Sequence, residues 1–224
     1  MRIFKIIISA LLSVILVLLP FASVIAFCAE SPAQYENSFV NALRQKRKRL
    51  LAVEDEKIVI IGGSSVAFGI DSELIEKYIE KPVINFGLYA ALGTKLMLDL
   101  AREGIGEGDL VIIAPELDAQ TLSLYFNSEA TLEAFDGELS LMNKLRGDDL
   151  FSALGGMWRF AAAKAKYMRE GEIPDPEGVY NSKNFTPHGD VDYERRENVM
   201  QLYYDPSLPI DPHESIVSPE FIDY

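Results

Sequence analysis

An uncharged apolar run near the start of the chain limits what the rest can fold into. Residues 6–27, 22 in all, carry no charge and follow Arg2 and Lys5. A helix of that length can cross the hydrocarbon core of a bilayer. The run also fits a secretory signal, because Val24 to Ala26 suit a signal peptidase and Pro20 breaks the helix just before them. The sequence therefore predicts a signal peptide or a membrane anchor over residues 1–30.

The charges around this run predict which side of the membrane the rest occupies. Arg2 and Lys5 favour a cytoplasmic N-terminus, so everything after residue 30 is expected at the extracytoplasmic face of the cell membrane, or secreted if the leader is cleaved. Five basic residues lie between positions 44 and 49. We interpret them as the solvated face of an amphipathic connecting helix within residues 31–56. A site for lipid headgroups is the alternative.

Composition excludes several classes of function. The chain of 224 residues has a formal net charge of −13, so it would repel a nucleic acid backbone, and we expect no nucleic-acid partner. Cys28 is the only cysteine, which rules out an intrachain disulfide and a cysteine-based zinc site. Two histidines, His188 and His213, leave few metal ligands. We therefore expect neither a metal nor another cofactor.

Three short apolar runs predict the core. Residues 57–62, 82–86 and 109–114 have the pattern of strands buried on both faces, which is typical of a parallel sheet. Amphipathic stretches between them predict helices, one capped by Asp71 and running to about Glu80, the other from about Thr94 to Arg102. Alternating strands and helices predict a doubly wound α/β core over residues 57–120.

Two further segments complete the chain. The pattern over residues 121–173 predicts a helical insertion that covers the core. Residues 174–224 are rich in aromatic side chains and hold seven of the eleven prolines, which excludes a regular helix or a central strand over most of their length. They either form a lid that stacks sugars near the first strand's end or pack on the helical cover.

Ligands of doubly wound sheets bind beyond the carboxyl ends of the strands. Residues 63–69, 87–93 and 115–118 follow the three predicted strands. Among them, Ser64 and Ser65 lie on a glycine-rich turn before a helix, where backbone N–H groups can stabilise an oxyanion. The alternative is that these serines cap the helix or bind phosphate.

The serine turn resembles a known family. The sequence Ile-Ile-Gly-Gly-Ser-Ser-Val-Ala-Phe-Gly at 60–69 is similar to the first block of the SGNH (GDSL-like) hydrolases, and that register selects Ser65 as the nucleophile. Ser64 replaces the family's aspartate, as in the membrane-linked branch that handles acyl groups of the cell envelope. Asn85 and Gly87, followed by Gly93, resemble the second block.

The resemblance implies a doubly wound parallel sheet of flavodoxin-like strand order and an exported serine esterase or acyltransferase. Its substrates would be saccharide esters of the cell envelope. Gly87 and Gly93 are the implied oxyanion donors, with Ala90 as an alternative to them. Ser64, Asn85 and Glu116 are the implied substrate contacts, and no cofactor is implied.

Two departures from the family pattern predict an incomplete or inactive member. Glu116 stands where the third block has an asparagine, and an ionised carboxylate cannot donate to an oxyanion. Neither Asp211 with His213 nor His188 has the spacing of the family's Asp-x-x-His element. A helix start at 218–220 is followed by only four residues, which predicts a C-terminally truncated chain.

Two other interpretations of the sequence remain, each from a different class of protein. A non-catalytic envelope protein with this fold could bind a ligand beside Glu116. A nucleotide-binding module, with residues 62–69 as its phosphate loop, is the weakest reading, because no lysine follows at the required position.

Overall fold

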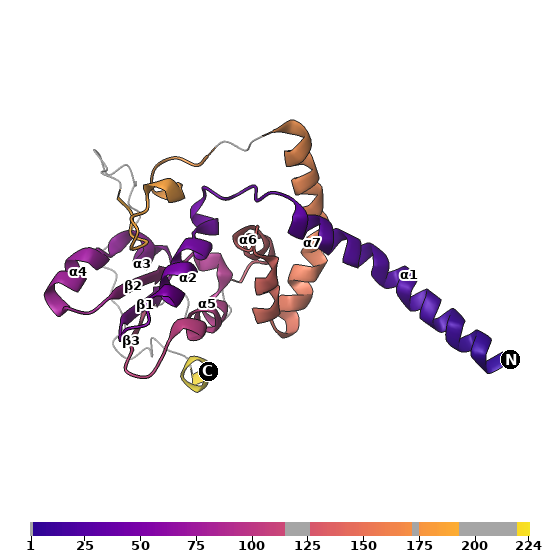
Figure 1. The fold of residues 1–224 in the computed structure, drawn as a ribbon, viewed down its shortest axis with the longest axis horizontal. Helices are drawn as coiled ribbons and strands as arrows, with labels where there is room; N and C mark the ends of the chain where they lie inside the picture. The colour runs from indigo at the N-terminus through magenta and orange to yellow at the C-terminus, as the bar shows by residue number, and fades with distance from the viewer. Residues whose placement is uncertain (1, 115–125, 172–174, 193–218) are drawn as a thin grey trace.

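The structure, a computed structural model, describes residues 2–114, 126–171, 175–192 and 219–224. Its centre is a parallel sheet of three strands, β1 (Ile58–Gly62), β2 (Val83–Gly87) and β3 (Leu110–Ala114). The strand order is β2-β1-β3, with Ile58 opposite Val83 and Leu110 (Figure 1). The predicted α/β class is confirmed, and each strand starts one residue after its predicted start.

Helices connect the strands where the amphipathic patterns predict them. The first connection holds α3 (Ser64–Gly69) and α4 (Ser72–Ile79), and the second holds η2 (Ala90–Leu92), α5 (Thr94–Ala101) and η3 (Arg102–Gly104). Asp71 caps α4 as predicted, because its carboxylate accepts a hydrogen bond from the Leu74 N–H at 2.9 Å.

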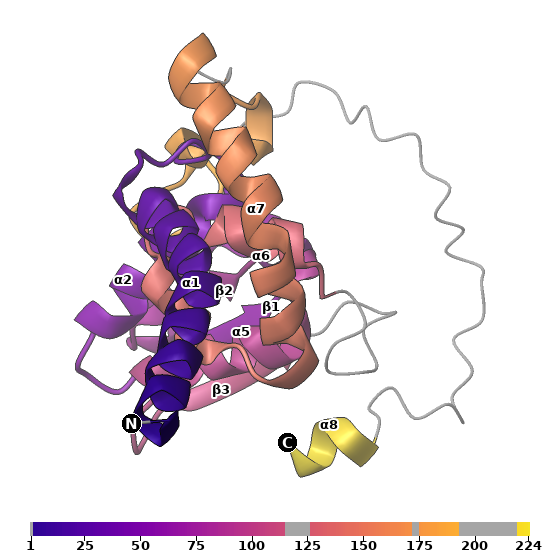
Figure 2. The ribbon, with the colours of Figure 1, turned by 90° about the vertical axis from the view of Figure 1, so that its right-hand side faces the viewer.

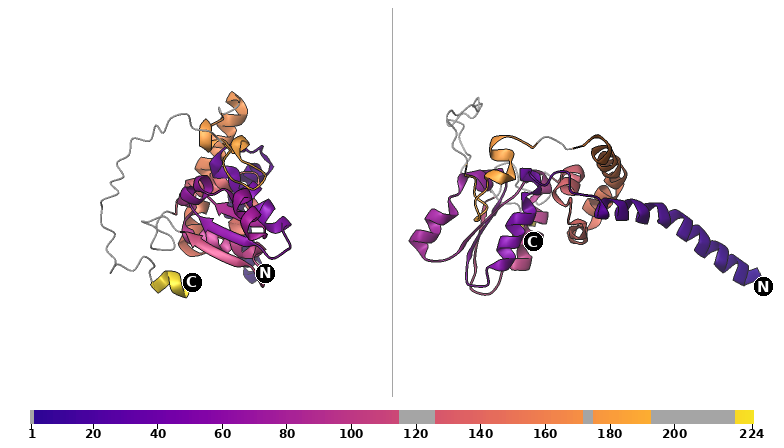
Figure 3. Two further views of the ribbon diagram at one scale, coloured as in Figure 1. Left: turned by 90° about the vertical axis from the view of Figure 1, so that its left-hand side faces the viewer. Right: turned by 45° about the horizontal axis from the view of Figure 1, so that its top comes forward.

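The N-terminal part consists of α1 (Arg2–Glu30), η1 (Phe39–Ala42) and α2 (Leu43–Ala52). Helix α1 is long and apolar enough to cross a membrane or to serve as a signal sequence. Its N-terminal end extends far from the sheet (Figure 3).

The basic residues of α2 do not form the solvated face that the sequence predicts. Lys46 is fully buried, Arg47 pairs with Glu103 and Glu138 at 2.8 Å each, and Arg49 pairs with Glu76 at 2.8 Å. The prediction is therefore wrong for these three side chains. Intramolecular carboxylates pair with the two arginines, whose side chains are each 21% exposed.

The expected helical cover contains α6 (Ser128–Ala134), η4 (Leu139–Lys144) and α7 (Gly147–Glu170). Helix α7 packs on α6 and on the C-terminal half of α1 (Figure 2). A buried ion pair between Lys164 and Asp136 joins the cover to the start of the chain, because Lys164 also donates to the Pro32 carbonyl at 2.8 Å.

The apolar core has two main parts. One lies between the sheet, α2 and α5, and is built around Leu43, Leu50, Ile84 and Leu100. The other joins α1 to the cover: Cys28, which is fully buried, packs with Leu132, Met157 and Phe160. The last turns of α1 are therefore part of the folded body.

Strand β3 differs from its prediction. All residues of β1 and β2 are buried, whereas Leu110, Ile112 and Ile113 of β3 are 55%, 44% and 41% exposed. The prediction of burial on both faces is wrong for β3 within the described residues. Helices α2, α3 and α4 pack on β2, the strand at the opposite edge, whereas the main neighbour of β3 within the described residues is β1.

The described part of the tail contains η5 (Gly178–Tyr180), η6 (Ser182–Asn184) and α8 (Pro219–Asp223). Single antiparallel bridges join Ser38 to Asn181 and Phe185 to Val191. The C-terminal residue lies against α5, where the Tyr224 hydroxyl donates to the Asp99 carboxylate at 2.6 Å.

Candidate functional site

The candidate site is the turn that follows β1. Gly63 caps the N-terminus of α3, Ser64 is half-buried, and Ser65 is exposed. Because β1 is the central strand, the chain leaves it toward one edge of the sheet and later crosses to the other (Figure 1). Ligands of open α/β sheets bind where the strand order reverses in this way. Ser65 therefore lies where the topology favours a ligand.

Two glycines allow α3 to sit directly on the strand ends. A Cβ atom added at Gly87 would lie 2.2 Å from the backbone nitrogen of Ala67 in α3. One added at Gly62 would lie 2.5 Å from Cγ2 of Val66 in α3 and 2.4 Å from the Ala114 carbonyl oxygen of β3. Neither position has room for a side chain, so these glycines fix the height of the Ser65 helix above the sheet.

Both glycines implied as oxyanion donors have backbone N–H groups that donate within the chain. The Gly87 N–H donates to Oδ1 of Asn85 at 3.0 Å, and the Gly93 N–H donates to the Ala90 carbonyl at 3.0 Å. Gly93 has φ +77°, which favours glycine, and ends the η2 turn. Either group would have to give up its present acceptor to stabilise an oxyanion.

Asn85, an implied substrate contact, is fully buried. Its Nδ2 donates to the Val66 carbonyl at 3.1 Å and to Oδ1 of Asp190 at 2.8 Å. Its Oδ1 accepts from the Gly87 N–H and, at 3.2 Å, from Nζ of Lys46. An amide has two donors and two acceptor positions, and here all four are used. Asn85 thus holds β2, α2 and α3 together.

Sequence reasoning missed the buried polar network around Asn85. Asp190 accepts from the Ser72 N–H at 2.7 Å and from the Ser72 hydroxyl at 2.9 Å, and Lys46 donates to the Gly189 carbonyl at 2.7 Å. Burial lowers the pKa of Lys46 to about 7, although the charge of Asp190 acts to raise it. One signal was available, because Lys46 shares the apolar stripe of Leu43 and Leu50.

An aromatic layer covers the outer side of the Ser65 helix. The centroid of the Phe68 ring in α3 lies 4.6 Å from that of Phe39. It lies 5.8 Å from the centroid of Tyr180, which it meets edge to face. Phe185 packs against Phe39 and Ala67. Residues 178–191 of the tail therefore pack over α3, next to the serine turn. Tyr180 remains 57% exposed there.

His188 lies at the other end of the sheet from Ser65. Its Nε2 is 3.0 Å from Oε2 of Glu76, whose other oxygen accepts from the Val83 N–H at 2.8 Å. Val83 starts β2, whereas the serine turn follows the far end of β1, about 13 Å away along the strands. Burial raises the pKa of Glu76, but hydrogen bonds from Val83 and His188 outweigh it, so the pKa lies below its usual range.

Other predicted residues lie outside the described part of the chain: Glu116, Asp211 and His213. Within the described residues, no group of three or more histidine, cysteine, aspartate or glutamate side chains is arranged to hold a metal ion.

Comparisons with known proteins find no match to this chain among protein-family models, curated proteins or solved structures. The fold and the geometry around Ser65 are therefore the basis for any functional proposal.

Proposed function

We propose that this chain is a membrane-attached, exported α/β protein of the SGNH hydrolase type, which uses Ser65 to cleave or transfer acyl groups on saccharide esters of the cell envelope. One observation carries the proposal: an exposed serine stands at the helix N-terminus that follows the central strand, where the strand order reverses. The motif at residues 60–69, which resembles the first block of the SGNH hydrolases, supports acyl transfer as the type of reaction.

The chemistry would be a nucleophilic acyl transfer. The Ser65 hydroxyl oxygen attacks the ester carbonyl, a base takes the hydroxyl proton, and the alcohol leaves with a proton returned to it. Water, or an acceptor hydroxyl in a transfer, then attacks the acyl ester on Ser65, and Ser65 leaves with its proton restored. Backbone N–H groups of the first turn of α3 point toward the developing oxyanion, where the helix dipole favours negative charge.

His188 is unsuited to be that base, because it is engaged by Glu76 at the amino end of β2. The proposal therefore assigns the base to a group outside the described residues. Asp211 and His213 are the first candidates in this chain, and a further polypeptide is the second.

The contacts of α1 support retention of the leader as a membrane anchor. Cleavage after Ala26 would cut a helix whose neighbouring side chains Val24, Phe27 and Cys28 pack against the helical cover. With Arg2 and Lys5 in the cytoplasm, the folded body would lie at the extracytoplasmic face.

Labelling by a fluorophosphonate ester tests the proposal, because such reagents form a covalent bond only with an activated serine. We expect mass spectrometry to find one adduct on Ser65 in the wild-type chain, none in Ser65→Ala, and an adduct in the control Ser152→Ala, which removes an exposed serine of α7. An unlabelled wild-type chain would refute catalysis by this chain alone.

A second candidate function is non-catalytic binding of an envelope saccharide at the same edge of the sheet. The internal hydrogen bonds of the Gly87 and Gly93 N–H groups favour it, because binding needs no oxyanion donors. Calorimetry with envelope saccharides separates the two candidates. Binding affinity that survives Ser65→Ala, without acyl turnover by the wild-type chain, would select this second function.

A further inference from the structure

Helix α7 presents a second apolar stripe besides the one that it buries. Its buried side, which includes Met157 and Phe160, packs on α6 and α1. On another side, Phe151 is 72% and Trp158 is 48% exposed. The spacing of an α-helix places six uncharged residues on this side. They are Phe151, Leu154, Gly155, Trp158, Ala162 and Ala165, and we call them the α7 stripe.

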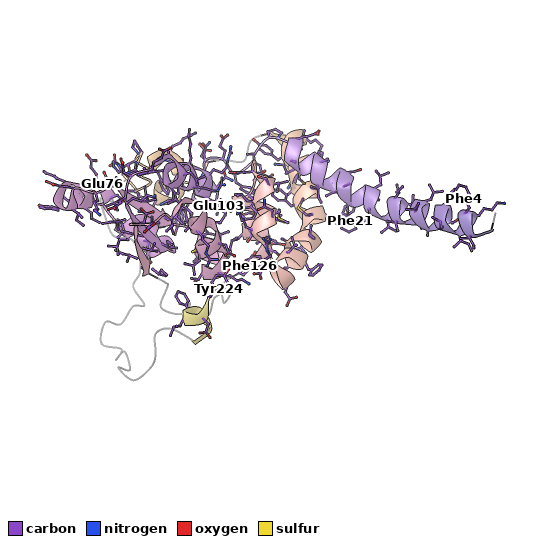
Figure 4. All side chains as sticks on the ribbon, turned by 60° about the horizontal axis from the view of Figure 1, so that its bottom comes forward. Phe4, Phe21, Glu76, Glu103, Phe126 and Tyr224 are labelled. Atoms are coloured by element: carbon purple, nitrogen blue, oxygen red, sulfur yellow. The ribbon has the colours of Figure 1, made fainter. Side chains whose placement is uncertain are left out.

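The α7 stripe adjoins the membrane-spanning candidate. The ring of Trp158 contacts that of Phe21 in α1 edge to face, with centroids 5.7 Å apart. Phe21 is itself 42% exposed, so the apolar surface continues from α1 onto α7. Figures 2 and 4 show α7 beside the half of α1 that contains Phe21.

The length of α1 places this contact at a definite depth. The apolar helix has 28 residues, which at about 1.5 Å each exceed the roughly 30 Å of a hydrocarbon core. About 20 residues suffice to cross that core, so a span that begins at Ile6, directly after Lys5, reaches the opposite boundary near Ile25, about one helical turn beyond Phe21. Trp158, which contacts Phe21, then lies within about one helical turn of the level where acyl chains meet headgroups.

We propose that the α7 stripe docks into the bilayer interface, so that the body is held on the lipid by α7 as well as by α1. Aromatic rings of this kind, and above all tryptophan, favour the boundary between acyl chains and headgroups. Helices with one apolar face lie in that plane and bury the face in lipid. The inference rests on the membrane attachment in the proposed function and is independent of Ser65.

Trp158 provides the probe, because it is the only tryptophan in the chain. The full chain is inserted into phosphatidylcholine vesicles whose acyl chains carry bromine close to the headgroup. We expect Trp158 to lose most of its emission in these vesicles and to resist quenching by aqueous iodide. Flotation of the vesicles measures attachment separately.

A pair of variants tests the stripe itself. Phe151→Glu places a charge on the stripe at an exposed position, and Ser152→Glu places the same charge on the neighbouring exposed residue, about 100° around the helix. We expect bromolipid quenching to fall sharply in Phe151→Glu only.

Four results would overturn the inference. Equal quenching in both variants would mean that α1 alone brings Trp158 close to lipid. Protection from both bromine and iodide would mean that protein, such as a second copy, covers the stripe. If the chain did not float with the vesicles, both the docking of α7 and the proposed membrane attachment would be contradicted. If it floated but showed no bromolipid quenching, only the docking of α7 would be contradicted.

Discussion

At the scale of single residues, the burial of a side chain determines its role in this fold more than its charge does. Lys46 belongs to a run of basic side chains, yet it is fully buried with three oxygen acceptors, whereas Lys48 on the same helix is exposed. The sequence indicates Lys46 only through its spacing from Leu43 and Leu50. Its partners could not be predicted, because Asn85 and Gly189 approach it from distant parts of the chain.

The lowered pKa of Lys46 predicts a pH dependence of stability. The folded state binds this proton more weakly than the unfolded chain, with a pKa of about 7 against 10.5. The free energy of unfolding should therefore rise between these two pH values. Urea titrations should show a smaller rise in Lys46→Met than in the wild type and an unchanged rise in the control Lys48→Met. Identical slopes in all three chains would contradict the prediction.

A second buried charge, that of Asp109, makes the stability depend on pH in the acid range. Asp109 pairs with Nζ of Lys57 at 2.9 Å and accepts from the backbone N–H groups of Lys57 and Gly106, which joins the starts of β1 and β3. Burial raises the pKa of Asp109, but these hydrogen bonds outweigh it and hold the pKa below its usual range. Its stabilising contribution is thus complete above the unfolded pKa of 3.8 and is lost as the pH falls through the folded value.

Replacement of Asp109 by asparagine tests this contribution. At neutral pH we expect Asp109→Asn to lose about 3 kcal/mol of unfolding free energy, because Lys57 stays buried without its counter-charge. The loss should shrink in acid, where the wild-type carboxylate is protonated as well. The exposed Asp55→Asn is the control in the same urea titrations. A variant as stable as the wild type would show that the pair contributes nothing.

At the scale of elements, the sequence predicts the strands and connecting helices well because each is a local pattern. Three apolar runs and the Asp71 cap are enough for them. The burial of β3 is not local, since it depends on which elements lie beside the strand. For the same reason the sequence could not predict that the segment with Tyr180 and Phe185 packs over the Ser65 helix. Of the candidate site, the exposed serine was predicted, but the internal partners of Asn85 and Gly87 were not.

The close contact between α3 and β2 gives a prediction at this scale. Gly87→Ala would force a methyl group into the backbone of Ala67, so α3 must move. We expect the free energy of unfolding to fall by about 1–3 kcal/mol. Fluorophosphonate labelling of Ser65 should be lost as well. Gly69→Ala is the matched control, because nothing lies within 4 Å of its added Cβ. Equal melting temperatures for the two variants would show that α3 is not fixed by this contact.

At the scale of the whole molecule, α1 is both an apolar span and a part of the core. A chain that starts at residue 24 keeps Val24, Phe27 and Cys28 against the helical cover, whereas one that starts at residue 31 exposes Leu132 and Met157 beneath them. We expect the second truncation to unfold at clearly lower urea concentration than the first. Equal midpoints would show that the last turns of α1 add nothing, as expected for a leader that is removed.

The continuity of α1 with the body also determines what the protein can reach. The helix runs unbroken to Glu30, and a few residues later the Gln34 N–H donates to the buried carboxylate of Asp136 at 2.7 Å. There is no slack linker between the two. With α1 retained as the proposed membrane anchor, the body could not swing as one on a tether does, so the serine edge would stay at one height and one tilt. Under the proposed function, only substrates that present their ester groups at that height would meet it.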